Sequence, residues 1–318
     1  TEEYGYVWYR SINGGAFEAQ EPTTYTSSAG KRLGSDIKAD GTELYIALNG
    51  GALGYTENNV TNTSVQYKVA VFNKSDIENS GLPKNGTTAI AESRTYSVTS
   101  YYEVRNGGFE TPNVRDKYKD YNHYQYSNAD YASSGGVWQT TGIGTGGKAG
   151  CDIEIINTKD DSYKSPYGSD GAAEGNQFAE LNCEAAGALY QDILTTPGET
   201  LNYQLSHRAR GSRADNTSEY DTMYVLIMST ALAKQYDVTT EAKAQDIVNH
   251  PENYSGATVV SYRDDDQKWT THQGVYNVPE GSEQYSTRFF FVAGTTASGN
   301  KTVGNFLDNI KLTRDRLT

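Results

Sequence analysis

The sequence predicts an all-β protein: an antiparallel β-sandwich jelly roll with a short helical insertion, preceded by a smaller β-sandwich module. Three observations lead to this prediction. The 318 residues include 26 Tyr and 32 Gly but only 2 Met, the apolar residues occur in short runs without long helical repeats, and clusters of Gly, Asn and Ser separate those runs. A chain of this length can form one large or two ordinary domains, each with its own core.

The charge narrows the range of partners. The formal net charge is −13 at pH 7, which argues against nucleic acid, because that partner would need a basic face. It suits neutral or cationic partners, or Ca²⁺. No apolar run reaches the length of a membrane span, so we expect no membrane insertion. The chain begins at TEEYGY without a signal peptide, so an export signal and any anchor would lie outside these residues, in a larger multidomain chain.

The first module is expected to span residues 1–104. Its strand-like segments are separated by turn-forming clusters and lie at 6–11, 44–48, 65–72 and 94–104. The last of them continues almost directly into residue 105. Because no linker intervenes, we expect the two modules to be joined rather stiffly.

The second module, residues 105–318, contains more strands. They are expected at 151–156, 177–183, 188–194, 201–210, 222–228, 257–262, 287–294 and 305–312. Residues 230–254 break the pattern with helix formers and a proline after His250, which predicts one or two short helices in a long crossover. This set of strands with one helical insertion favours a jelly roll.

Two of these strands can be aligned from the sequence. An antiparallel pairing of 151–156 with 177–183 sends Ile153, Ile155, Ala179 and Leu181 to one face, by period-two alternation. The same register places Cys151 opposite Cys183, the only two cysteines in the chain. We expect them to form a disulfide in an exported protein, with two free thiols as the alternative.

The other face of this pair carries acidic and polar groups. Glu154 lies opposite Glu180, and Asp152 lies opposite Asn182. Two facing glutamates repel and call for a nearby cation, and the end of strand 201–210 offers one. We interpret Glu154, Glu180 and Asn182, with His207, Arg208 and Arg210, as a polar floor for sugar hydroxyls. The alternative is a solvated sheet face with salt bridges at its rim.

A tyrosine-rich segment, 118–131, is expected to be a loop that could add aromatic contacts. It holds Tyr121, Tyr124 and Tyr126, with His123 among them. Aromatic rings stack on the C–H faces of sugars, but loop tyrosines can also pack onto a sheet. Trp138 and Trp269 are expected at the edge of the core, not in a site.

The C-terminal two thirds resembles the galactose-binding-like jelly-roll domains of bacterial surface proteins, which are related to carbohydrate-binding modules. The resemblance rests on an ordered set of segments: NGGFETP at 106–112, Trp138, IEI at 153–155, AELN at 179–182, YQDILTTPGETL at 190–201, HRAR at 207–210, DTMYVLI at 221–227, WTTHQGVYNVPEG at 269–281, TRFFF at 287–291 and GNFLDNIKL at 304–312. The first hundred residues resemble no family known to us.

This resemblance implies a structural calcium ion. In such domains the first and last strands come together, and acidic residues of the opening and closing motifs hold Ca²⁺. The matching positions are Glu110 and Asp308. Calcium takes six to eight oxygens, so carbonyls and water would complete the shell, and Gly107 and Gly108 would let carbonyls turn inward. The alternative is that Glu110 is a solvated strand residue and Asp308 a turn residue.

Three classes of function follow. The first is a non-catalytic carbohydrate-binding or adhesin module of a secreted or cell-wall-attached bacterial protein, whose partner is a glycan or a cell-surface glycoconjugate. The second is a structural stalk segment with a Lys–Asn crosslink. The third is a glycoside hydrolase that uses Glu154 and Glu180, facing each other at roughly 5 Å as in retaining enzymes. The sequence contains no Ser/His/Asp motif, phosphate-binding loop or zinc-ligand spacing.

Overall fold

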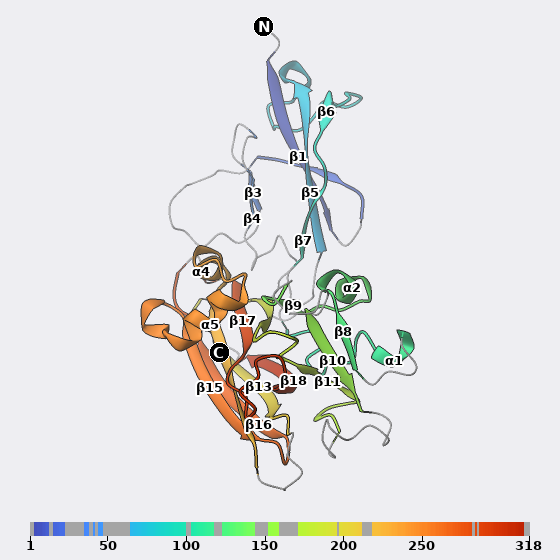
Figure 1. Cartoon of the computed structure of the whole chain (residues 1–318). Helices are drawn as coiled ribbons and strands as arrows, with labels where there is room; N and C mark the ends of the chain where they lie inside the picture. Colours follow the sequence, from blue (N-terminus) through green and yellow to red (C-terminus); the bar gives the residue numbers. More distant parts are fainter. Residues whose placement is uncertain are drawn as a thin grey trace. The chain divides into compact units, whose positions relative to one another are not determined.

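The structure is a computed structural model that describes residues 3–12, 15–22, 35–37, 41, 44–46, 64–99, 103–117, 123–143, 152–158, 171–195, 197–211, 218–281, 284 and 286–314 (Figure 1). The chain divides into two compact units. The N-terminal unit comprises Thr1–Tyr102 with Leu194–Thr196, and the C-terminal unit comprises Glu103–Ile193 and Pro197–Thr318. Each unit is described by itself.

The N-terminal unit is built on an antiparallel sheet. The central strands β1 (Tyr4–Ile12) and β5 (Ser64–Asn73) pair along their whole length. The other strands of this sheet are β2 (Glu18–Gln20), β6 (Ala91–Glu92) and β7 (Tyr96–Thr99). A short 3₁₀ helix, η2 (Lys74–Asp76), follows β5, and β3 (Ser35–Ile37) pairs with β4 (Leu44–Ile46). Val7, Ala70 and Phe72 form its small apolar core.

The C-terminal unit is a sandwich of two antiparallel sheets, and the predicted fold class is confirmed. The six-stranded sheet has the order β16 (Thr270–Asn277), β13 (Thr200–Arg208), β18 (Phe306–Arg314), β11 (Gln177–Glu180), β10 (Ile153–Asn157) and β8 (His123–Tyr126). The five-stranded sheet has the order β15 (Thr258–Asp265), β14 (Tyr220–Ser229), β17 (Ser286–Ala293), β12 (Ala188–Leu194) and β9 (Gln139–Thr140).

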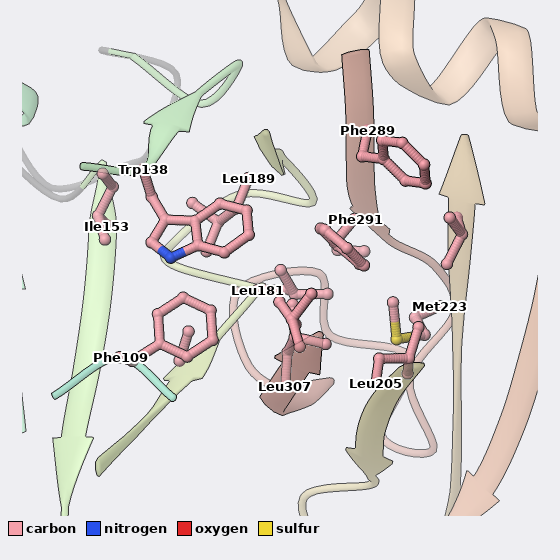
Figure 2. Close-up of a cluster of buried hydrophobic side chains, with 14 of the residues drawn as sticks. Phe109, Trp138, Ile153, Leu181, Leu189, Leu205, Met223, Phe289, Phe291 and Leu307 are labelled. Atoms are coloured by element: carbon pink, nitrogen blue, oxygen red, sulfur yellow. The ribbon is translucent and has the colours of Figure 1, made fainter. Parts of the chain in front are cut away.

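An apolar core fills the space between these sheets (Figure 2). Trp138 stacks on Phe109 with ring centroids 5.3 Å apart and meets Phe291 edge-on at 5.7 Å. Trp269 contributes to a smaller cluster with Phe178 and other residues on the outer side of the six-stranded sheet. Both tryptophans therefore serve packing, as predicted.

The predicted helical insertion is confirmed. It forms α4 (Thr230–Gln235), α5 (Glu241–Asn249) and the 3₁₀ helix η4 (Pro251–Asn253). Side chains Ser229 and Thr240 accept hydrogen bonds from the first turns of α4 and α5 and so begin both helices. Buried residues of these helices pack on the outer face of the five-stranded sheet: Ala233, Ala244, Ile247 and Val248 with Leu226, Met228, Phe290 and Val292.

Several elements differ from the prediction. The predicted tyrosine loop contains strand β8 and helix α2 (Asn128–Ser133), and helix α1 (Val114–Lys117) precedes it. Strand β16 was not predicted because its sequence, TTHQGVYN, has few apolar residues and the strand forms an edge of its sheet. Period-two burial still marks it as a strand, since its residues alternate between half-buried and exposed.

The predicted register of β10 and β11 is confirmed. Glu154 pairs with Glu180, and Ile155 pairs with Ala179. Ile153, Ile155, Ala179 and Leu181 consequently belong to the core between the sheets. Cys183 is buried and Cys151 lies outside the described residues. No free cysteine occurs in the described part of the chain, and the disulfide stays a prediction.

Candidate functional site

A row of polar side chains crosses three neighbouring strands on the outer side of the six-stranded sheet. Gln125 on β8 pairs with Glu154 on β10, which pairs with Glu180 on β11. The side-chain amide of Gln125 donates to Glu154 Oε2 at 3.2 Å. Gln125 was missed in the sequence because β8 was not recognised as a strand. Had the pairing been extended from β10 to β8, Gln125 would have been placed opposite Glu154.

Arg210 supplies the cation that the facing glutamates require. Its NH1 group donates to both carboxylate oxygens of Glu180, at 2.8 and 3.0 Å. The backbone N–H of Gly304 donates to Glu180 Oε1 at 2.6 Å. The side chain of Arg210 is 23% exposed while that of Glu180 is fully buried. The polar row therefore reaches solvent at its Arg210 end.

The two glutamates are buried, so they do not form an ordinary solvated sheet face. Residue exposure is 5% for Glu154 and 1% for Glu180. Burial, together with the charge of Glu154, raises the pKa of Glu180 to about 8, although the bonds from Arg210 and Gly304 act in the opposite direction.

Three other residues of the predicted polar floor lie inside the molecule. Arg208 is 1% exposed, and its guanidinium lies 5.4 Å from the ring centroids of both Trp269 and Phe306. His207 is buried and bonded to Asp264 on the opposite sheet, and Asn182 is buried and bonded to the backbone of Lys301. Neighbouring side chains and backbone enclose these three residues, and their contact with a ligand stays a prediction.

The structure places two of the predicted aromatic residues in strand β8. Tyr124 and Tyr126 lie opposite Ile155 and Ile153 in the sheet, so alternation directs them to the core side. Tyr126 is fully buried, and the partly buried Tyr124 packs against the same cluster, with the two rings 4.6 Å apart. Both rings therefore contribute to packing, and their contact with a sugar stays a prediction. Tyr121 lies outside the described residues.

The two predicted calcium ligands meet the same turn of the chain. Glu110 Oε1 accepts hydrogen bonds from the backbone N–H groups of Asn176 and Gln177, at 2.7 and 2.8 Å. Asp308 Oδ2 accepts one from the N–H of Glu174 at 2.8 Å. The first and last segments of the unit come together nearby, where the N–H of Ile310 donates to the carbonyl of Gly107 at 3.0 Å.

The local environment of Asp308 is unfavourable for an isolated negative charge. Its side chain is fully buried, and burial raises its pKa to about 8 despite hydrogen bonds from the backbone of Glu174, Asn309 and Ala173. A bound cation would offset this cost. Within the described ranges, however, no three His, Cys, Asp or Glu side chains are grouped so as to hold a metal ion. A calcium site here would depend on main-chain carbonyls as well as the two carboxylates.

A second polar cluster, which sequence reasoning missed, joins the loops beside Arg210. Asp221 Oδ2 accepts hydrogen bonds from the backbone N–H groups of Arg210 at 3.0 Å and Asn305 at 2.8 Å. Its other oxygen accepts one from the N–H of Ala297 at 2.8 Å. No local pattern could reveal these contacts, because they join segments far apart in the chain.

No protein-family model and no curated protein sequence matches this chain. Among solved structures, it is similar to TmCBM61 in complex with β-1,4-galactotriose (14% identity, TM-score 0.32, covering 67% of this chain and 97% of that one). It is also similar to a cyclase from Fischerella sp. TAU (12%, TM-score 0.40, 68% and 96%) and to the CBM22-1 xylan-binding domain from Paenibacillus barcinonensis Xyn10C (13%, TM-score 0.29, 56% and 92%). Similarities this weak say nothing of a ligand.

Among the residues that the structure describes, no helix is long and apolar enough to cross a bilayer.

Proposed function

We propose that the C-terminal unit is a non-catalytic carbohydrate-binding module of a secreted or cell-surface bacterial protein, where it could serve as an adhesin. The observation that carries the proposal is the row formed by Gln125, Glu154, Glu180 and Arg210. Its members are fixed by hydrogen bonds to one another, and the row ends at a partly exposed guanidinium.

Such a row suits sugar hydroxyls for a physical reason. Each hydroxyl both donates and accepts hydrogen bonds, and the row offers amide, carboxylate and guanidinium groups within one face. Because buried partners hold Glu180 and Arg210 in place, binding would immobilise few additional side chains. The accessible end is small, so we expect weak binding, in the range typical of a solvated ligand that offers little contact area.

The burial of the glutamates favours binding over hydrolysis. A glycosidase needs one carboxylate to reach the anomeric carbon and another to reach the leaving oxygen. Glu154 and Glu180 are 5% and 1% exposed, and Glu180 is committed to Arg210 and Gly304. These features support a role for the pair in holding Gln125 and Arg210 in place within the row.

A structural calcium ion is part of the proposal. Glu110 and Asp308 would hold it together with main-chain carbonyls of the turn at 173–177. The buried, desolvated carboxyl of Asp308 supports a cation at this place. The ion would tie the opening segment of the unit to its last strand and would take no part in ligand chemistry.

Export of the protein would also favour a disulfide between Cys151 and Cys183. Extending the register of β10 and β11 beyond Glu154 and Glu180 brings these positions opposite each other. Peptide mapping without reduction should recover one linked peptide pair. Two alkylatable thiols in the native, unreduced protein would contradict the pairing.

A glycan array tests the main proposal. The intact chain should retain at least one glycan, and Arg210→Ala should lose it while circular dichroism shows that the variant is folded. Lys311→Ala is the matched control, since it removes an exposed cation whose pairing with Glu174 lies at the surface. Retention of the glycan by folded Arg210→Ala would exclude this face as the site.

A further inference from the structure

A continuous chain of hydrogen bonds runs from between the two sheets to the loop at 301–305. His207 is fully buried, with Nδ1 2.7 Å from Oδ2 of Asp264 and Nε2 2.9 Å from Oδ1 of Asn305. The side-chain amide of Asn305 donates to Oδ1 of Asn182 at 3.0 Å, and the amide of Asn182 donates to the carbonyl oxygen of Lys301 at 2.9 Å.

The far end of this chain determines the direction of its bonds. A backbone carbonyl can only accept, so Asn182 must present its NH₂ group to Lys301 and its oxygen to Asn305. Asn305 must then present its NH₂ group to Asn182 and its oxygen to His207. Rotating either amide by half a turn would bring two acceptors together. Since the oxygen of Asn305 only accepts, Nε2 of His207 carries a hydrogen.

The other ring nitrogen of His207, Nδ1, faces Asp264. The same Oδ2 atom of Asp264 lies 2.7 Å from Nε2 of His272. The carboxyl group therefore joins the two histidine rings and fixes the orientation of the His207 ring toward Asn305.

We propose that His207, whose Nε2–H is directed at Asn305, is a positioning residue for the polar row of the candidate site. The charged or titratable groups around the cluster are Asp264 and Tyr262 of β15, His272 of β16, Asp221 of β14 and Arg210, which follows β13. Asn182 and Asn305 carry no charge.

The coupling to the polar row passes through Asn305. Its backbone N–H donates to Asp221, which also accepts from the N–H of Arg210. The residue before it, Gly304, donates its N–H to Glu180, the partner of the Arg210 guanidinium. By fixing the side chain of Asn305, the Nε2–H of His207 holds this backbone in place. The consequence for glycan binding rests on the proposed function, whereas the hydrogen on Nε2 does not.

Nitrogen-15 NMR of histidine-labelled intact protein tests the position of the ring hydrogen directly. The chain has four histidines, and the His207→Gln and His250→Gln variants assign two of them. At pH 7, Nε2 of wild-type His207 should carry a hydrogen. A His207 ring without a hydrogen on Nε2 at pH 7 would overturn the proposal.

Amide hydrogen exchange tests the positioning role without any ligand. In His207→Gln the Gly304 N–H should exchange at least tenfold faster than in the wild type, and His250→Gln should leave it unchanged. If His207→Gln does not fold, His207→Gln/Asp264→Asn also removes the carboxyl group that faced the lost ring and should show the same faster exchange. An unchanged Gly304 rate in a folded variant would overturn the positioning role. Failure of the wild type to bind any glycan would contradict the proposed function only.

Discussion

Both outer faces of the C-terminal sandwich contain buried residues, but these residues differ in chemistry between the two faces. On the five-stranded sheet, helices α4 and α5 cover an apolar cluster that includes Leu226, Met228 and Phe290. On the six-stranded sheet, the outer face carries Glu154, Glu180 and Asp308 among aromatic side chains. On the five-stranded sheet, helices bury their own apolar residues against apolar residues of the sheet, as is usual for a helix packed on a sheet.

The difference concerns the free energy of burying each kind of side chain. Burying an apolar side chain stabilises the fold, whereas burying a carboxyl group costs free energy unless a cation or several donors compensate it. On the polar face the compensation is specific: Arg210 and Gly304 for Glu180, and three backbone N–H groups for Asp308. We interpret the burial of these carboxyl groups, which costs free energy, as a consequence of the proposed binding of a ligand and a cation.

Truncation on each face should have a large effect but a different pH dependence. Leu226→Ala removes fully buried methyl groups and should destabilise the unit by about 3 kcal/mol at every pH. Arg210→Ala leaves Glu180 without its cation and should cost about 3 kcal/mol at pH 9, but less at pH 5, where Glu180 is protonated. Urea unfolding at both pH values measures this contrast. An equal loss at pH 5 and pH 9 for Arg210→Ala would contradict the assigned ionisation of Glu180.

Calcium should stabilise the polar face increasingly as pH rises. The pKa of Asp308 is raised from 3.8 to about 8, so its contribution to stability is present at low pH and is lost as pH rises through about 8. Ca²⁺ binds the carboxylate form and reverses that loss. At 100 times its dissociation constant it would add about 2.7 kcal/mol. Melting curves with Ca²⁺ or EDTA should differ little at pH 5 and clearly at pH 8, and should converge in Glu110→Ala.

A melting temperature that EDTA leaves unchanged at pH 8 would contradict the calcium proposal. Mg²⁺ at the same concentration is the control for a general salt effect, since it demands a more regular octahedral shell.

Gly304 should be sensitive to substitution because its backbone approaches the polar row closely. It has φ +129°, and a Cβ there would lie 2.7 Å from Asp221 Oδ2 and 2.6 Å from a methyl group of Thr296. Gly299, in the same loop, also has positive φ (+69°) but has open space around it. Gly304→Ala should therefore cost about 2 kcal/mol and Gly299→Ala about 1 kcal/mol. Equal losses would mean that the close approach does not matter.

The sequence was sufficient to predict the strand register that organises the site. Alternation of Ile153 and Ile155 against Ala179 and Leu181 determines which face enters the core, and this places Glu154 opposite Glu180. The helical insertion followed from its helix formers and from the proline after His250. These features depend on local periodicity, which a single sequence displays directly.

The remaining parts depend on information that a local pattern does not contain. A tyrosine can stack on a sugar or fill a core with equal ease, so Tyr124 and Tyr126 could not be assigned before strand β8 was known. The direction of His207, which leaves the polar floor and points between the sheets, depends on Asp264 in a distant strand. The same holds for Asp221, whose partners come from two separate loops.

Calorimetric titration of the glycan that the array identifies tests whether the polar row binds it. Gln125→Ala removes a half-buried member of the polar row without removing a charge, and His250→Gln alters an exposed residue of the helical insertion. Gln125→Ala should lose at least tenfold in affinity, equivalent to about 1.4 kcal/mol, and His250→Gln should lose none. Equal affinity of folded Gln125→Ala and the wild type, or the absence of any bound glycan, would contradict binding at the polar row.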